Sequence, residues 1–227
     1  MKNNNSNNNQ LIEVVKLLIL YSIFCVFLSV IRIIISHNFE LWFLLWNLLL
    51  AWVPMVAGYY LYKRTSKFGL AWSKLNAVLF AVWLFFIPNS FYLMTDFIHL
   101  KTVYGMETMF DIVLLMAYAL AGLALGFISL IIVHLRVNKR FGPKIGIRFA
   151  YIILLLSGFA IYLGRYQRWN SWDVLVNPLG ILYDVSDRFI NPSEHSLTFS
   201  TTILYFAFLG ILYSIIWRAS KILIPKK

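Results

Sequence analysis

The stretch MFDIVLLMAYALAGLALGFISLIIV, residues 109–133, decides the fold, because only one of its side chains, that of Asp111, is charged. A membrane helix needs roughly 20 mainly apolar residues to cross about 30 Å of hydrocarbon. Residues 109–133 meet that requirement. Five further stretches also do, near 17–35, 41–62, 75–94, 149–165 and 197–217. The sequence therefore predicts an all-α bundle of six membrane spans.

The composition of the whole chain agrees with that prediction. Of its 227 residues, 61% are apolar and only 13% are charged, whereas soluble domains have about 45–50% apolar and about 25% charged residues. The apolar excess must face lipid. We expect one membrane domain, residues 11–227. Residues 1–10 contain six asparagines and no apolar residue after Met1, which predicts a short disordered leader.

The distribution of basic residues predicts the orientation of the spans. One side holds 15 of the 20 basic residues and one acid, and the other side holds five basic and eight acidic residues. Lys and Arg in short loops tend to stay in the cytoplasm, so we expect both termini to be cytoplasmic and the protein to lie in the cell membrane. The net charge of +11 then reflects topology and contact with anionic membrane lipids, and nucleic acid is not an expected partner.

Two spans contain a proline together with an asparagine. The second span reads WNLLLAWVP, residues 46–54, and the third reads FFIPNSFY, residues 85–92. A proline inside a helix removes one amide donor, so we expect bends at Pro54 and Pro88. Asn47 and Asn89 lie at similar depth near the outer ends of these spans. Either the two amides satisfy the carbonyls that the prolines free, or two broken helices line a polar cavity, as in many transporters.

The fourth span carries a row of small residues that includes Gly122 and Gly126. The G-x-x-x-G spacing lets two helices approach closely. The contact is either internal to the bundle or made with a second copy or another membrane protein, and the sequence leaves both readings open.

The loop after the third span reads YLMTDFIHLK, residues 92–101. On a continuing helix, Tyr92, Asp96 and His99 fall on one face. Asp96 could orient the His99 imidazole as a general base or as half of a metal site, with Asp111 as a third candidate ligand. Pairing at the interface, or binding of a lipid or solute, explains the same residues. The sequence predicts no cofactor, and it does not decide whether the protein is an enzyme.

Arginine and tryptophan are concentrated where the fifth span ends, in GRYQRWNSWD, residues 164–173. Arginine forks suit phosphate and carboxylate groups, and indoles lie readily at head-group depth. The alternative is that both arginines pair with nearby aspartates and lock the loops. The candidate binding residues on the outer side are Asn47, Asn89, Tyr92, Asp96, His99, Arg165, Arg168, Trp169, Asn170, Trp172 and Asp173.

An amphipathic helix is predicted just beyond this cluster. Asn177 can cap it, with Pro178 at its first position, and Asn191 and Pro192 end it. Its apolar residues form a stripe opposed by charged residues. We expect this helix to lie on the outer membrane surface.

Three motifs in order, WNLLLAWVP, PNSFYLMTDFIHL and GRYQRWNSWD, resemble a bacterial family of predicted integral membrane proteins, the domain-of-unknown-function family thirteen-sixty-one. The resemblance runs from about Trp46 to about Phe206. It implies an architecture but no activity. The motif positions are Asn47, Trp52, Pro54, Pro88, Asn89, Tyr92, Asp96, His99, Arg165, Arg168, Trp169, Asn170, Trp172 and Asp173.

Four functions remain open at this stage. The first is an integral membrane protein whose outer polar pocket binds an anionic lipid or cell-envelope intermediate. The second is a small-solute transporter that uses the proline-containing spans. The third is a metal-dependent membrane enzyme using Asp96, His99 and Asp111, although the sequence contains no G-x-S-x-G, H-E-x-x-H or Walker motif. The fourth is a structural subunit of a larger complex.

Overall fold

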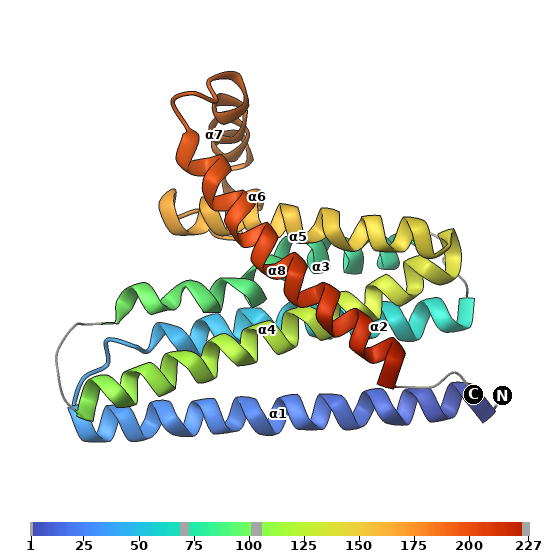
Figure 1. Ribbon diagram of the computed structural model, residues 1–227, viewed down its shortest axis with the longest axis horizontal. Coiled ribbons are helices and arrows are strands. Elements are labelled where there is room, and N and C mark those ends of the chain that lie inside the picture. The colour runs from blue at the N-terminus through green and yellow to red at the C-terminus, as the bar shows by residue number, and fades with distance from the viewer. Residues whose placement is uncertain (1, 69–72, 101–105, 224–227) are drawn as a thin grey trace.

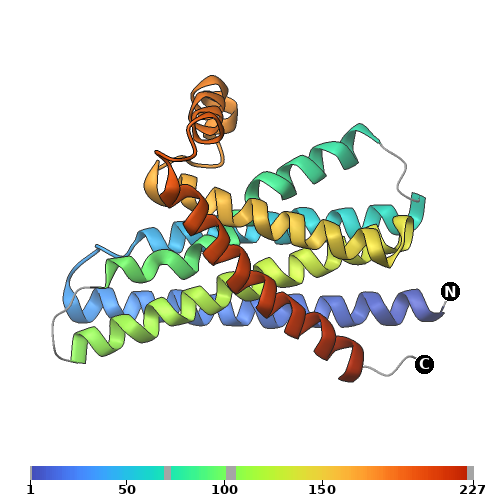
Figure 2. The same cartoon turned by 45° about the horizontal axis from the view of Figure 1, so that its top comes forward.

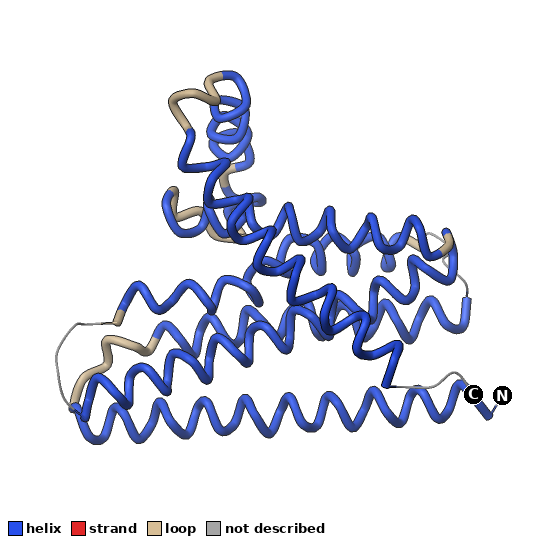
Figure 3. The backbone as a smooth tube through the Cα atoms, viewed as in Figure 1, coloured by secondary structure: helices blue, strands red, loops and turns tan. Residues whose placement is uncertain are grey.

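The computed structural model describes residues 2–68, 73–100 and 106–223, and within these ranges the chain is helical and contains no strand (Figure 3). The helices are α1 (Lys2–Ser36), α2 (Phe43–Phe68), α3 (Lys74–Tyr92), the 3-10 helix η1 (Leu93–His99), α4 (Met106–Phe141), α5 (Pro143–Tyr166), α6 (Asp173–Val176), α7 (Pro178–Ile190) and α8 (Ser196–Leu223).

The described residues contain six segments that are long and apolar enough to cross a membrane, so the predicted number of spans is confirmed. The third segment extends further than expected, because η1 continues α3 as far as His99. The six segments are Asn9–Ser36, Phe43–Arg64, Lys74–His99, Glu107–Phe141, Pro143–Tyr166 and Ser196–Ile222. The all-α class is confirmed, and the chain has the architecture of a multi-pass membrane protein.

The Asn-rich segment is not a separate leader in this structure, because α1 already begins at Lys2. Asparagine has a low intrinsic helix propensity. However, once a long apolar helix has formed, each further turn adds hydrogen bonds without a new nucleation cost. The helix therefore continues through these residues.

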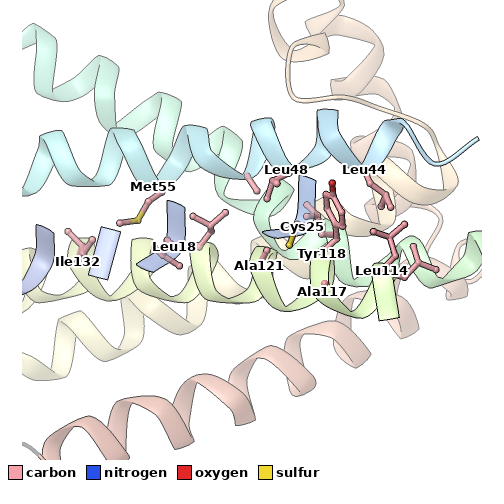
Figure 4. Packing of buried hydrophobic residues seen from close by; sticks show 14 residues of the cluster. Leu18, Cys25, Leu44, Leu48, Met55, Leu114, Ala117, Tyr118, Ala121 and Ile132 are labelled. Atoms are coloured by element: carbon pink, nitrogen blue, oxygen red, sulfur yellow. The ribbon is translucent and has the colours of Figure 1, made fainter. Parts of the chain in front are cut away.

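Helix α4 lies at the centre of the bundle and contacts α1, α2, α3, α5 and η1 (Figure 1). One apolar cluster joins it to α1 and α2, with Leu18, Leu48 and Tyr118 among its buried members (Figure 4). The Tyr118 hydroxyl lies 2.7 Å from that of Ser29 on α1. A second cluster joins α4 to α3, α5 and α8 around Trp83. Through these two clusters, α4 packs against α1 and α2 on one side and against α3, α5 and α8 on the other.

A buried histidine packs beside the second cluster. His134 on α4 is fully buried, and its Nδ1 lies 2.5 Å from the hydroxyl of Tyr213 on α8. Its ring also packs against Trp217, with the ring centroids 4.3 Å apart. His134 therefore links the helices α4 and α8.

Gly122 and Gly126 of α4 pack closely against another helix of the same chain. A Cβ added at Gly122 would lie 2.3 Å from the carbonyl oxygen of Ser90, and one added at Gly126 would lie 2.6 Å from the Phe91 ring. Both neighbours belong to α3. Within the chain, α3 and η1 cover this face of α4. A second copy or another protein that binds through it stays a prediction.

Neither proline interrupts its helix: Pro54 lies within α2 and Pro88 within α3. Serine hydroxyls from neighbouring helices donate to α2 carbonyls at or close to Pro54. Ser90 donates to Ala51 (3.0 Å) and Ser129 to Pro54 (2.8 Å). Such added donors satisfy backbone groups that lipid cannot. The predicted broken helices are thus continuous helices, although α3 tightens into a 3-10 helix at Leu93, five residues after Pro88.

The amphipathic helix α7 is confirmed with its predicted ends. The Asn177 side chain accepts a hydrogen bond from the Gly180 amide (3.1 Å), and Pro178 occupies the first position. Helices α6 and α7 lie to one side of the long helices, next to the end of α5 and the start of α8 (Figures 1 and 2). We call this end of the bundle the outer end, following the charge distribution. The first turn of α1 and the last turn of α8 lie toward the opposite end (Figure 2).

Candidate functional site

A cavity of about 500 Å³ lies at the outer end of the bundle among α2, α3, η1, α5 and the α5–α6 connection. Eight of the eleven predicted binding residues line it: Asn47, Asn89, Tyr92, Asp96, His99, Arg165, Trp169 and Asn170. The fold therefore brings together three motifs that lie far apart in the sequence. Arg168, Trp172 and Asp173 do not line the cavity.

A buried ion pair forms the polar end of the cavity. Arg165, in the last turn of α5, donates from Nη2 to Oδ1 of Asp96 on η1 at 2.7 Å. The second oxygen of Asp96 accepts from Nδ2 of Asn47 on α2 at 3.0 Å. The Asp96 side chain is only 2% exposed. The carboxylate thus joins three helical segments, and its negative charge is offset by Arg165.

The remaining donors of Arg165 hold the guanidinium in place. Nε donates to the Thr95 hydroxyl at 3.1 Å, and Nη2 also donates to it. Nη1 lies 3.3 Å from Nε2 of His99, and the guanidinium carbon lies 4.3 Å from the centre of the Tyr92 ring. Arg165 therefore contacts both Asp96 and His99, so the His99 imidazole is oriented through the arginine. Thr95 is a site residue that sequence reasoning missed, because threonine next to a charged residue carries no distinct signal.

Asn89 fixes the outer covering of the cavity. Its Nδ2 donates to the Ser171 hydroxyl at 2.8 Å, and Ser171 donates to the Phe85 carbonyl at 3.0 Å. Phe85 lies in the turn that contains Pro88. Ser171 thus ties the α5–α6 connection to α3. Sequence reasoning did not select Ser171, although it lies inside the third motif.

Arg168 is exposed and takes a left-handed backbone conformation, with φ of 60°. This conformation is common where a helix ends, and the next amide, that of Trp169, returns to the Leu163 carbonyl (3.2 Å). Within the part of the chain that the structure describes, Arg168 has no ion pair or hydrogen-bond partner. The predicted pairing of both arginines with aspartates therefore holds for Arg165 and not for Arg168.

The last two predicted binding residues hold the connection together. Asp173 accepts a hydrogen bond from the Asn170 amide at 2.6 Å, and Trp172 packs edge-on against Trp46, with ring centroids 6.3 Å apart. The Trp169 indole donates to Asp184 on α7 at 2.7 Å. Helix α7 is thereby connected to the wall of the cavity.

Asp187, a residue of α7, holds the segment that follows this helix. This carboxylate accepts from Nδ2 of Asn191 at 2.8 Å, and Nε2 of His195 lies 2.7 Å from it. The hydrogen bond from Asn191, followed by the contact with His195, lowers the pKa of Asp187 below its ordinary value. His195 therefore has a structural partner in Asp187.

The candidate metal ligands are not brought together. Asp111 accepts two hydrogen bonds from Arg32 on α1, at 3.0 and 3.1 Å, away from Asp96 and His99. No group of three His, Cys, Asp or Glu side chains suited to a metal ion occurs among residues 2–68, 73–100 and 106–223. The arrangement of Asp96, His99 and Asp111 as a metal site is therefore corrected, because an arginine occupies the position of a cation at each of the two aspartates.

The rest of the cavity wall is apolar. Leu50 on α2, Leu84 and Phe85 on α3, and Leu156 and Ala160 on α5 line it toward the middle of the bundle. The cavity is thus amphipathic, with charged and amide groups at its outer end and hydrocarbon at its inner end.

These features define an α-helical membrane protein with six candidate spans and an amphipathic cavity at one end of the bundle. Residues 46–212 match the family model described as "Protein of unknown function (DUF1361)". The match covers most of the chain, and the protein belongs to this family. No curated protein and no solved structure matches the chain.

Proposed function

We propose that the protein binds an anionic lipid or cell-envelope intermediate in the outer cavity. The observation that carries this proposal is the amphipathic cavity itself, in which apolar walls from α2, α3 and α5 end at the buried cluster of Arg165, Asp96 and His99. Its volume of about 500 Å³ falls within the range of roughly 300–1,000 Å³ that is typical of small-molecule sites.

The two arginines have different parts in this proposal. Asp96 offsets the charge of Arg165 at 2.7 Å, so Arg165 acts as a fixed hydrogen-bond donor rather than as a free cation. Arg168 is exposed, precedes the cavity residue Trp169 and has no acidic partner among the described residues. It supplies the uncompensated positive charge that a phosphate group at the mouth of the cavity would meet.

The test is native mass spectrometry of the full chain in nanodiscs that contain phosphatidylcholine and phosphatidylglycerol. We expect the wild type to retain phosphatidylglycerol preferentially and the Arg168→Gln variant to lose most of that preference. Arg148→Gln is the matched control, because Arg148 is also exposed and lies near the opposite end of α5. The control should behave as the wild type does.

Two results would overturn the proposal. One is a wild type that retains no anionic amphiphile, either from nanodiscs or from native membranes. The other is an equal loss in both arginine variants, because that would indicate a general effect of net charge. The mass of any species retained from native membranes distinguishes a phospholipid from an envelope intermediate.

A further inference from the structure

We infer that the ligand's hydrocarbon chain lies in the inner, apolar arm of the cavity and reaches it sideways from the outer leaflet of the membrane. This inference rests on the proposed function and adds the ligand's physical class and its route. The ligand is then a membrane-resident amphiphile and not a water-soluble anion.

The cavity is long enough along α5 to have a polar end and a separate apolar end. Leu156 and Arg165 both line it and are nine residues apart on α5. At 1.5 Å per residue, they lie about 14 Å apart along the helix. A water-soluble phosphate compound has no apolar part to cover the side chains that line the inner part of this length, such as Leu84, Phe85 and Ala160. A hydrocarbon chain covers the same surface favourably.

The apolar arm has exposed side chains on the membrane-facing side. Two of its lining residues, one from α3 and one from α5, are partly exposed: Phe85 (46%) and Leu156 (47%). Each belongs to a candidate membrane span. In a membrane, such exposed surface faces lipid, so the arm is continuous with the hydrocarbon of the bilayer.

The side of the cavity toward the outer surface is covered. Residues 169–171, together with Val174 and Ile181, line it there. Two attachments hold this cover: Asn89 and Ser171 bond at 2.8 Å, and Trp169 and Asp184 bond at 2.7 Å. Ser171 also donates to the Phe85 carbonyl at 3.0 Å, so the cover extends along α3. The proposed lateral route therefore lies on the α5 side, next to Leu156, whereas a ligand from water must pass the covered side.

The experiment uses phosphatidylglycerol with a photoreactive diazirine in one acyl chain, incorporated in nanodiscs with the full protein. We expect labelled peptides from α3 near residues 84–89 and from α5 near residues 156–160. Ala160→Trp fills the apolar arm and should abolish both labels. Ile152→Trp introduces the same indole two turns away on α5, outside the cavity lining, and should leave them. Leu84→Trp, on α3, is the second variant in case Ala160→Trp does not fold.

The outcomes separate this inference from the proposed function. If Arg168→Gln reduces lipid retention while a folded Ala160→Trp or Leu84→Trp variant keeps the labelling pattern, the head-group site stands and the chain position is wrong. If glycerophosphoglycerol, the deacylated head group, displaces the lipid at equal concentration, the ligand is water-soluble and the inference fails. If the arginine and tryptophan variants all bind as the wild type does, the proposed function fails as well.

Discussion

At the scale of single residues, the charge on Asp96 matters most. Its carboxylate is almost fully buried and receives hydrogen bonds from Arg165 and Asn47. A buried charge is tolerated when it is paired and hydrogen-bonded, and removing one partner leaves the other uncompensated. This residue therefore holds η1 against α2 and α5 while it shapes the polar end of the cavity.

We expect Asp96→Asn to destabilise the protein by about 3–5 kcal/mol, because it leaves the Arg165 guanidinium buried without an anion. The double variant Asp96→Asn, Arg165→Gln removes both charges and should be less destabilised than the single variant. Thermal unfolding in detergent, followed by intrinsic fluorescence, measures the difference. If the losses from the two single substitutions simply add in the double variant, the two residues are not coupled.

At the scale of the elements, the packing of α3 on α4 depends on the absence of two side chains. The Ser90 carbonyl and the Phe91 ring occupy the space that Cβ atoms at Gly122 and Gly126 would need. Since Ser90 and Phe91 follow directly on Asn89, this close contact also sets the depth at which α3 presents Asn89 to the cavity.

We expect Gly122→Ala to destabilise the protein by roughly 1–3 kcal/mol, the usual cost of overpacking a close-packed core. Gly210→Ala on α8 is the control, because its added Cβ would meet the Tyr151 ring at an ordinary 3.4 Å. Both substitutions raise intrinsic helix propensity by the same amount. Melting temperatures of the two variants in the same detergent make the comparison, and equal values would contradict the close contact.

At the scale of the whole molecule, the two ends of the bundle carry different features. The start of α1 and the end of α8 lie toward one end of the bundle, and the cavity and α7 lie toward the other (Figures 1 and 2). If the basic side is cytoplasmic, the cavity is next to the outer leaflet.

This orientation can be tested with cysteine labelling, since Cys25 is the only cysteine and is buried. In a Cys25→Ala background, we expect Glu194→Cys to react with a membrane-impermeant maleimide in intact cells. Lys139→Cys should react only after permeabilisation. Both positions are exposed, so the opposite pattern would reverse the assigned sides and place the cavity at the inner leaflet.

The sequence by itself determined the number of spans, the α7 helix with its two ends and most of the polar residues of the cavity. These features depend on local patterns: apolar length for the spans, the Asn177–Pro178 cap for α7, and polar residues placed at span ends. The extent of α1 was not predicted, because helix propagation into an Asn-rich segment depends on the apolar helix that follows.

Only the tertiary structure decided which polar groups meet. From sequence, Arg165 and Arg168 were equivalent, and Asp96 and Asp111 were both candidate partners or metal ligands. In the fold, Asp96 pairs with Arg165 and Asp111 pairs with Arg32, whereas Arg168 is exposed. It also placed α3 on Gly122 and Gly126. Pairings between residues 69 to 79 positions apart depend on how helices pack, and helix packing is set by side-chain shape over the whole bundle rather than by any local pattern.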